Sequence, residues 1–575
     1  MNKQYKVANT KKSERLYKKA SNVTELMKVY RAHGDKTFFS WKEQNEQKEI
    51  SYPEFADFVE KYAAGLRELF GDVSVKIAVI GENSPRWVAS YLAVMLSGNV
   101  VVPMDKELSK DEILKFAEYA DVAAIAHSDT FSSFFEEKVV REGHPTVRCL
   151  IPFTVSGENE DMPTDGKARV IDIDSVASIG EGKDAVAEPD DPDACCELLF
   201  TSGTTGSSKC VMLSKRNIFS DIMSACATVD FYPDDVLVSV LPLHHTYELM
   251  CTVAASCYGT KICVCPALRY AMKAFKEYQP TALILVPLFV STMYKRILSE
   301  AKKAGKDKAL ITISKLSHAL NFARINTSEL FFKDVREAFG GKLKKIICGG
   351  AALAPELITA FDSFGIAIYE GYGITECSPL VAVTPYYKRK PGSVGLPVPC
   401  CQVSIQGENV GESGNITGEI LVKGTNVMLG YMDNDDANAE AFDDDGWFHT
   451  GDVGYLDEDG YLYITGRQKS VIVLENGKNV FPEEIEEYLY KFDEVSETVV
   501  IGREEDDTVV LTAVIIPAYE KFPETEESEL KSVIQKKVTA LNKTLPSFKQ
   551  IHKIEFRKTE FEKTSSNKIK RYLVK

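Results

Sequence analysis

The sequence has no Cys-x-x-Cys pair, no secretory signal and no long uninterrupted apolar run. Its 13 cysteines lack the paired spacing with nearby histidines that a structural zinc site needs, so we expect reduced thiols in a cytoplasmic protein. The most apolar region, residues 236–266, is interrupted by His244, His245, Glu248 and Lys261. Charged groups are costly in lipid, so this region is expected to be buried core.

Positive charge is also in deficit, since the formal net charge of the 575 residues is −16. Nucleic-acid binding needs a basic face, so nucleic acid is not expected as a partner. Residues 1–20 carry many lysines but no apolar segment of a signal peptide. A solvated tail is the favoured interpretation, with weak peripheral contact to an anionic membrane as the alternative.

The chain is longer than one hydrophobic core usually serves, so two or more domains are expected. Short β-branched runs alternate with helical patterns, which predicts an α/β fold with parallel-type sheets covered by helices. The expected strands are 75–80, 100–103, 122–126, 344–348 and 366–369, and the expected helices are 85–97, 110–119 and 355–364. Such sheets bind ligands at the carboxyl ends of their strands.

The pattern changes in the last third of the chain. Residues 392–464 are rich in turns and predict a β-rich subdomain with a strand at 419–422. The last hundred residues predict a small α+β lid. Its expected elements are a helix at 483–490, strands at 498–500 and 509–516, and a charged helix beginning near residue 526.

Residues 201–209, Thr-Ser-Gly-Thr-Thr-Gly-Ser-Ser-Lys, separate the apolar runs 198–200 and 211–213 and predict a strand, a loop and a strand. Backbone amides and hydroxyls would donate to phosphate oxygens, and Lys209 would add charge. The segment is not a Walker A loop, because no Gly-Lys-Ser/Thr stands before a helix. An ordinary polar turn is the alternative.

Four further segments contain polar or charged side chains suited to binding a ligand. Residues 370–376, Glu-Gly-Tyr-Gly-Ile-Thr-Glu, offer an aromatic ring for a base, a hydroxyl for phosphate and a carboxylate for Mg²⁺. Residues 449–452, His-Thr-Gly-Asp, offer a carboxylate for ribose hydroxyls, and residues 466–469 offer Arg467 for ribose or phosphate. A basic tail follows at 564–571. Each segment alone is also typical of a turn or a solvated tail.

In this order the segments resemble the adenylate-forming, or AMP-binding, superfamily of acyl-CoA synthetases, luciferases and adenylation domains of peptide synthetases. The resemblance runs from about residue 25 to the end. It is closest to AMP-forming long-chain fatty acyl-CoA synthetases, through residues 241–248, 371–379 and 477–486. It implies an AMP-binding domain over 1–468, with the β-rich subdomain at 392–464, and a mobile lid domain over 469–575 that hinges at Lys469.

The chain departs from the family pattern at four positions. Ser208 and Cys210 stand where the phosphate loop commonly has Pro and Gly, and Lys215 replaces the usual downstream His. Asn567 replaces the Gly before Lys568, and Asn also tolerates unusual backbone angles. The phosphate donors of the loop are retained.

The resemblance implies an ATP-dependent acid–CoA ligase that makes an acyl-adenylate and transfers the acyl group to coenzyme A, with ATP and Mg²⁺. Lys568 would bridge the substrate carboxylate and the α-phosphate, Glu376 would bind Mg²⁺, and Thr204 would contact phosphate. The expected ATP and AMP contacts are Thr201, Ser202, Gly203, Thr205, Gly206, Lys209, Gly350, Ala351, Ala352, Glu370, Gly371, Tyr372, Gly373, Thr375, Asp452 and Arg467. Gly477 and Lys478 would line the coenzyme A tunnel, and His245 either gates the acyl pocket or is a packed histidine.

The acid is expected to be a medium- or long-chain fatty acid. Glu248 is followed by apolar and small residues over 249–256, which favours an uncharged acyl tail over an amino acid. The alternatives are an aryl-acid CoA ligase and an acyl-AMP ligase that loads a separate carrier protein. A non-catalytic nucleotide-binding sensor is the alternative from a different class.

Overall fold

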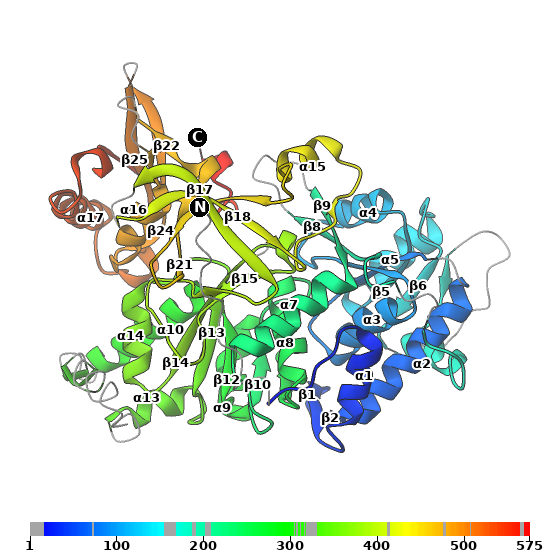
Figure 1. Cartoon of the computed structure of the whole chain (residues 1–575). Helices are drawn as coiled ribbons and strands as arrows, with labels where there is room; N and C mark the ends of the chain where they lie inside the picture. Colours follow the sequence, from blue (N-terminus) through cyan, green and yellow to red (C-terminus); the bar gives the residue numbers. More distant parts are fainter. Residues whose placement is uncertain are drawn as a thin grey trace.

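Figure 1 shows a computed structural model of the whole chain. The structure describes residues 16–71, 74–154, 168–186, 191–201, 209–303, 305, 309–310, 312–314, 317, 331–410, 414–474, 479–505, 508–563 and 569–574. In this described part of the chain, no helix is both long and apolar enough to cross a membrane.

Two large mixed sheets form the first two thirds of the molecule. The nine-stranded sheet has the order β16 (Leu396–Pro397), β15 (Leu380–Val383), β14 (Ala367–Gly373), β13 (Lys345–Gly349), β12 (Ala282–Leu285), β10 (Val236–Ser239), β11 (Lys261–Val264), β1 (Thr37–Glu43) and β2 (Glu46–Ser51). The eight-stranded sheet has the order β19 (Gly430–Tyr431), β9 (Lys209–Ser214), β8 (Cys195–Thr201), β4 (Val100–Pro103), β3 (Lys76–Ile80), β5 (Val122–His127), β6 (Cys149–Pro152) and β7 (Arg169–Val170). The central strands of both sheets run parallel, and antiparallel pairs lie toward the edges. The expected α/β class with parallel-type sheets is confirmed.

Helices cover these sheets, and α7 and α8 lie between them (Figure 1). The helices of this part are α1 (Val23–Arg31), α2 (Tyr52–Phe70), α3 (Pro85–Leu96), α4 (Lys110–Tyr119), α5 (Ser132–Phe135), α6 (Ile173–Ile179), α7 (Lys215–Thr228), α8 (Thr246–Ser256), α9 (Ala271–Tyr278), α10 (Pro287–Lys303), α13 (Lys333–Ala338) and α14 (Pro355–Ser363). One apolar core contains side chains from both sheets and from the helices between them. The region 236–266 is buried core, as expected.

The helix starts follow from the local sequence. Ser51 and Ser109 each form a reciprocal capping box with the glutamate three residues on, at the starts of α2 and α4. Prolines stand in the first turns of α3, α14 and α16 (Pro482–Tyr490), where no intrahelical N–H bond is lost.

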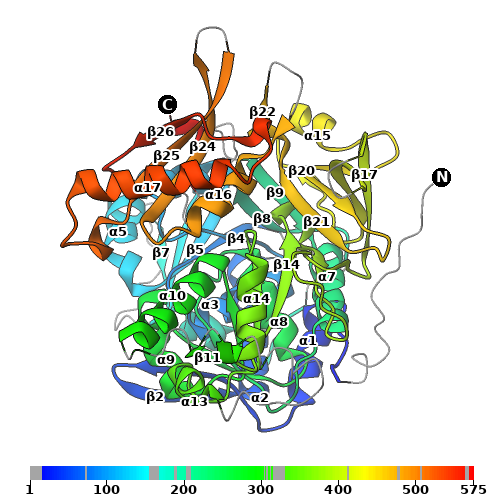
Figure 2. The ribbon, with the colours of Figure 1, turned by 90° about the vertical axis from the view of Figure 1, so that its left-hand side faces the viewer.

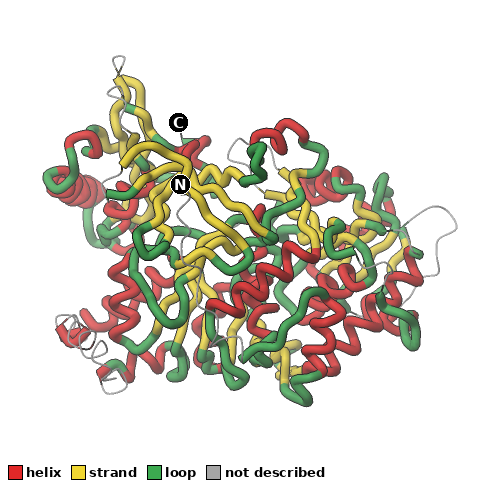
Figure 3. Tube along the Cα trace, in the orientation of Figure 1, coloured by secondary structure: helices red, strands yellow, loops and turns green. Residues whose placement is uncertain are grey.

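The β-rich subdomain is an antiparallel sheet of β17 (Cys401–Val410), β18 (Ile416–Gly424), β20 (Phe448–Leu456) and β21 (Leu462–Arg467). Helix α15 (Asp435–Ala441) lies between β19 and β20 in the sequence. Figure 3 shows this strand-rich layer above the helix-covered sheets.

The C-terminal part is a small α+β unit with its own apolar core. It contains β22 (Ile472–Val473), β23 (Asn479–Val480), α16, β24 (Val495–Glu505), β25 (Thr508–Pro517), α17 (Glu527–Asn542) and β26 (Lys553–Phe556). Strand β26 pairs in parallel with β25, which the sequence did not predict. Figure 2 shows this unit over the face that carries α10 and α14. There Lys491 Nζ lies 2.9 Å from Glu356 Oε1, and Lys295 Nζ donates to the Tyr490 carbonyl at 3.4 Å.

The start of the chain differs from the expected solvated tail. Residues 1–15 lie outside the described residues, but Tyr17 and Ala20 are buried. The Tyr17 ring lies 5.5 Å from that of Tyr258, and the Lys18 amide donates to the Cys257 carbonyl at 3.0 Å. Aromatic burial therefore fixes this end of the tail to the core.

Candidate active site

A cavity of about 1550 Å³ lies at the carboxyl ends of strands from both large sheets. Its wall includes the last residue of each of four strands: Pro103 of β4, Thr201 of β8, Gly349 of β13 and Gly373 of β14. The β-rich subdomain and residues of the C-terminal unit complete the wall. This is the place where open α/β sheets bind ligands.

Lys209, Tyr431 and Glu376 form one polar group in this wall. Thr201 and Lys209 face each other in the antiparallel β8–β9 pair, and Tyr431 of β19 pairs with the next part of β9. The Lys209 ammonium lies 4.4 Å from the centroid of the Tyr431 ring, and the Tyr431 hydroxyl donates to Glu376 Oε1 at 2.9 Å. Burial and the Glu376 charge raise the pKa of Tyr431, so the phenol stays a donor.

Asp452, Tyr372 and Arg467 form a second group. Asp452 faces Arg467 in the β20–β21 register, and Arg467 Nε lies 2.8 Å from Asp452 Oδ1. The Tyr372 hydroxyl donates to Asp452 Oδ2 at 2.7 Å. Asp452 is 3% exposed, while Arg467 lines the cavity and is about half exposed. The Asp452 charge raises the pKa of Arg467, so the guanidinium stays charged. Tyr372 and Arg467 line the cavity, whereas Asp452 lies behind them and does not. Each of its carboxylate oxygens keeps a second lone pair for a further hydrogen bond.

The remaining expected nucleotide contacts divide into two sets. Gly350, Ala351, Gly371, Gly373 and Thr375 line the cavity. Gly350 has a φ of +88°, a conformation that favours glycine. The cavity wall does not include Ala352 or Glu370.

Glu370 is buried away from this wall. Burial raises the pKa of its carboxyl to about 8, and the like charge of Glu487 on α16 adds to the shift. Glu370 was expected as a nucleotide contact, and the structure does not bring its side chain into the cavity wall with the other residues.

Part of the expected site lies outside the described residues. These positions are Ser202, Gly203, Thr204, Thr205, Gly206, Gly477, Lys478 and Lys568. Described residues next to two of these segments line the cavity: Thr201 and Lys209 on either side of residues 202–208, and Lys563 and Lys570 on either side of residues 564–568. Lys469, in the turn after β21, lines it as well. Lys563 also forms an isolated antiparallel bridge with Ile569. Cations therefore line the cavity of a chain whose net charge is −16.

The loop before α8 carries two adjacent histidines that line the cavity. His244 Nε2 lies 3.3 Å from Asp105 Oδ1, and the rings of His244 and His245 are 4.2 Å apart. Asn83 holds the same loop by donating to the Leu241 carbonyl at 2.6 Å. The sequence pattern indicated His245. It did not indicate His244 or Tyr431, because Asp105 and Glu376, the residues they contact, lie in distant elements.

Glu248 is fully buried in the first turn of α8 and also lines the cavity. Burial raises the pKa of its carboxyl to about 8, so this group is mostly neutral near pH 7. It therefore does not supply the permanent anion that a substrate ammonium would require.

The donor set fits a metal ion that enters with a nucleotide. Within the described ranges, no group of three or more His, Cys, Asp or Glu side chains could hold a metal ion alone. Mg²⁺ commonly needs only one or two carboxylates besides substrate phosphates and water. Glu376, whose carboxylate lines the cavity beside the Lys209 and Tyr431 pair, supplies such a ligand.

Comparisons with solved structures show the fold. ATP-bound MatB from Rhodopseudomonas palustris superposes with a TM-score of 0.71 at 23% identity, covering 95% of this chain and 98% of that one. The anthranilate CoA ligase AuaEII in complex with anthranoyl-AMP superposes with a TM-score of 0.75 at 18% identity, covering 98% of each chain.

Comparisons of sequence show the family. Long-chain-fatty-acid–CoA ligase 6 of Mus musculus is 30% identical over 496 residues, which cover 82% of this chain and 70% of the relative. Long-chain-fatty-acid–CoA ligase 1 of Cavia porcellus is 29% identical over 494 residues with the same coverage. Residues 27–432 match the AMP-binding enzyme family, and residues 469–575 match the AMP-binding enzyme C-terminal domain. The chain belongs to the AMP-binding enzyme family.

Proposed function

We propose that this chain activates a medium- or long-chain fatty acid as an acyl-adenylate and transfers the acyl group to coenzyme A. The enzyme class, an AMP-forming acyl-CoA synthetase, follows from the family and from curated relatives near 30% identity. The fatty acid, the site residues and the domain boundary at residues 468 and 469 are parts of the proposal.

The fatty-acid assignment rests on a set of mostly apolar residues in the cavity wall, contributed by α7, α8 and the segment around β10. We call this part of the cavity the apolar branch. Tyr247, Met250, Cys251 and Ala254 line it from one face of α8, at the spacing of successive helical turns. The cavity wall also includes Ala225, Cys226, Val229, Phe231 and Val240. Each methylene buried against such a surface contributes about 0.8 kcal/mol. With Glu248 mostly neutral, this branch suits an uncharged hydrocarbon tail.

At the polar end, the carboxylate of the acid and the phosphates of ATP repel each other. We assign Lys209 to the β- and γ-phosphates, Glu376 to the metal, and Asp452 with Arg467 to the ribose. Bound Mg²⁺ would neutralise phosphate charge. The cations fixed in the wall before the reaction stabilise the charge that develops at the α-phosphate.

Lys568 is assigned to bridge the substrate carboxylate and the α-phosphate. Support comes from its described neighbours Lys563 and Lys570, both of which line the cavity. A lysine there would obstruct the thiol of coenzyme A, so the unit 469–575 is proposed to rotate about Lys469 before thioester formation. The match to a separate C-terminal family begins at residue 469.

The test is pyrophosphate release from ATP with saturated acids of four to twenty carbons, benzoate and anthranilate, followed by thioester analysis with free coenzyme A. Release with fatty acids and a coenzyme A thioester support the proposal. Preference for the aromatic acids would favour an aryl-acid ligase. Adenylate without thioester would favour loading of a carrier protein, and no release with any acid would favour a nucleotide sensor.

We also propose a cytoplasmic location. All 13 cysteines are free thiols, and 11 of them are buried. Free thiols are typical of a reducing compartment.

A further inference from the structure

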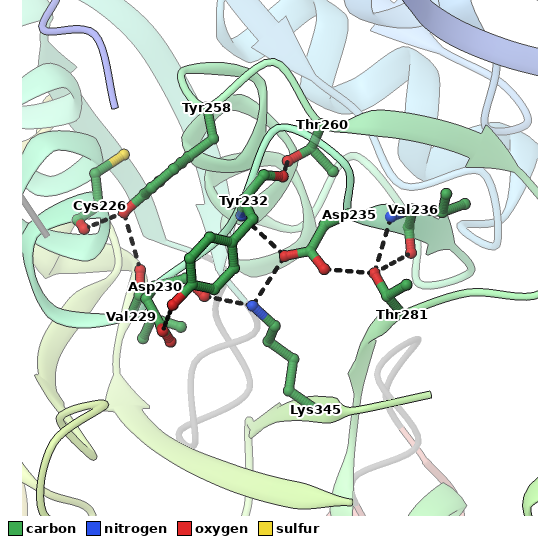
Figure 4. A network of polar contacts seen from close by, with 10 residues as sticks. All are labelled: Cys226, Val229, Asp230, Tyr232, Asp235, Val236, Tyr258, Thr260, Thr281 and Lys345. Carbon is green, nitrogen blue, oxygen red and sulfur yellow. Dashed lines mark hydrogen bonds and ion pairs between the residues drawn. The ribbon is translucent and has the colours of Figure 1, made fainter. Parts of the chain in front are cut away.

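A network of polar contacts with a buried centre lies at the amino ends of three neighbouring parallel strands, β10, β12 and β13 (Figure 4). Lys345 begins β13, Asp235 directly precedes β10, and Thr281 directly precedes β12. Lys345 Nζ lies 2.9 Å from Asp235 Oδ2, and the Thr281 hydroxyl donates to Asp235 Oδ1 at 2.6 Å. The Lys345 and Asp235 side chains are only 7% and 3% exposed. The nucleotide residues lie at the opposite edge of this sheet.

This Lys345 network, made of Asp230, Tyr232, Asp235, Thr281 and Lys345, fixes the loop between α7 and β10. The Lys345 ammonium donates to the Asp230 carbonyl, and the Tyr232 amide donates to Asp235 Oδ2 at 2.9 Å. The Tyr232 hydroxyl donates to Asp230 Oδ2 at 2.8 Å. The backbone is therefore held on both sides of the one intervening residue, number 231.

That residue is Phe231, and its ring is buried. Lys345 Nζ lies 4.7 Å from the ring centroid, and the ring of Tyr258 lies 5.9 Å away. The Tyr258 hydroxyl also donates to the Val229 carbonyl at 3.1 Å. Phe231 thus lines the cavity while its ring packs against the Lys345 ammonium and the Tyr258 ring.

Phe231 lies near the C-terminal end of α8, because its ring is 5.9 Å from that of Tyr258, which follows the helix, and it precedes the amino end of β10. The cavity-lining face of α8 begins with Tyr247 near the polar edge and continues to Ala254. The seven steps from Tyr247 to Ala254 advance about 10 Å at the rise of an α-helix. We propose that Phe231, held by the Lys345 network, is the end wall of the acyl tunnel and sets the longest chain that the enzyme accepts. This inference rests on the proposed function.

The network makes this wall hard to displace. Moving Phe231 back would push its ring into the buried ammonium and disturb a desolvated ion pair, and separating such a pair leaves an uncompensated charge. A cation over an aromatic face is itself attractive where water is excluded. For acids longer than the tunnel, kcat/KM should therefore fall steeply within a few added carbons. With a flexible apolar wall, kcat/KM would fall gradually with chain length.

The first experiment compares kcat/KM of the wild type, Phe231→Leu and Phe231→Ala on saturated acids from four to twenty carbons. We expect the optimum to move at least two carbons longer in Phe231→Ala. The first acid that the wild type rejects should gain about tenfold, since two newly buried methylenes each contribute about 0.8 kcal/mol. Shorter acids should change less than threefold.

The matched control is Phe361→Leu. Phe361 is fully buried on α14 in the same part of the molecule but does not line the cavity. It should lower the thermal midpoint without changing the chain-length profile. An equal profile change in both variants would overturn the end-wall assignment, because it would then reflect general loosening.

The network is tested by the double variant Lys345→Met with Asp235→Asn, which removes both charges together and avoids an unpaired buried ion. We expect it to fold and to accept acids beyond the wild-type limit, with a more gradual decline. A folded double variant with the wild-type limit would overturn the role of the network. If Phe231→Ala keeps the wild-type profile on an active enzyme, the end wall is wrong while the proposed function stands; a wild type inactive on every fatty acid overturns both.

Discussion

The hydroxyl of Tyr431 donates to Glu376 Oε1 at 2.9 Å, and this bond connects the edge strand of the eight-stranded sheet to the expected metal ligand. Strand β19, which carries Tyr431, is the edge strand next to β9, which begins at Lys209. The Tyr431 ring therefore contacts both Lys209, which we propose binds phosphate, and Glu376, which we propose binds the metal.

The first prediction separates these two contacts. Tyr431→Phe keeps the ring under Lys209 but loses the bond to Glu376, which should raise the Mg²⁺ concentration needed for half-maximal pyrophosphate release about tenfold. Tyr431→Leu loses both contacts and should also raise the KM for ATP. Tyr119→Phe removes one exposed phenolic bond, to the Met432 carbonyl, and serves as the control. Wild-type Mg²⁺ dependence in Tyr431→Phe would contradict the role in orientation.

The second prediction concerns the ribose. If Asp452 accepts from a sugar hydroxyl, the wild type should use 2′-deoxy-ATP about tenfold less well than ATP, because a bond to a charged acceptor is lost. Asp452→Asn should bind ATP more weakly and discriminate less between the two nucleotides. Steady-state kinetics with both nucleotides measures this. Unchanged discrimination in the variant would leave Asp452 as a structural partner of Arg467.

The third prediction assigns Lys568 to one half-reaction. Lys568→Ala should lose at least a hundredfold in acyl-adenylate formation, since it removes a charge that stabilises the transition state. It should still convert supplied acyl-adenylate and coenzyme A to thioester. Rapid-quench assays of each half-reaction decide the point, and equal loss in both would refute the assignment. Lys570→Ala is the control for loss of a nearby cavity-lining cation.

The fourth prediction reverses that pattern. Lys469→Pro stiffens φ at the hinge and should spare adenylation while slowing thioester formation at least tenfold. The same two half-reaction assays apply. Thioester formation at the wild-type rate would show that residue 469 is not the hinge.

The fifth prediction concerns stability and pH. Glu197 is fully buried, accepts from the Tyr91 hydroxyl at 3.1 Å, and has its pKa raised by burial to about 8. The folded state therefore holds a proton that the unfolded state releases near pH 4.5, so this contribution is full below that pH and is lost as pH rises through about 8. The slope approaches about 1.4 kcal/mol per pH unit within the window. Glu197→Gln should flatten the decline of the thermal midpoint between pH 6 and about 8; an unchanged decline would place its origin elsewhere.

The local pattern of the sequence was enough to predict much of the fold. Strand 100–103 and helix 110–119 have the predicted bounds, because alternation and helical periodicity are local signals. The order of the motifs also indicated several residues that line one cavity, from Lys209 to Lys469.

Long-range pairings could not be predicted in this way. Three such contacts join separate elements, and no periodic pattern encodes them. They are Tyr431 with Glu376, His244 with Asp105, and Lys345 with Asp235. The motif at residues 370–376 likewise did not specify that Glu370, on β14, lies outside the cavity wall.

The contacts between the C-terminal unit and α14 have a consequence for the reaction cycle. Lys491 and Glu356 are 41% and 68% exposed, and a surface pair of this kind is worth less than about 1 kcal/mol. Little free energy on this side opposes a change in orientation of the unit. Under the proposed rotation about Lys469, a difference in ligand affinity between the two orientations would therefore be enough to decide which one is populated at each stage of the reaction.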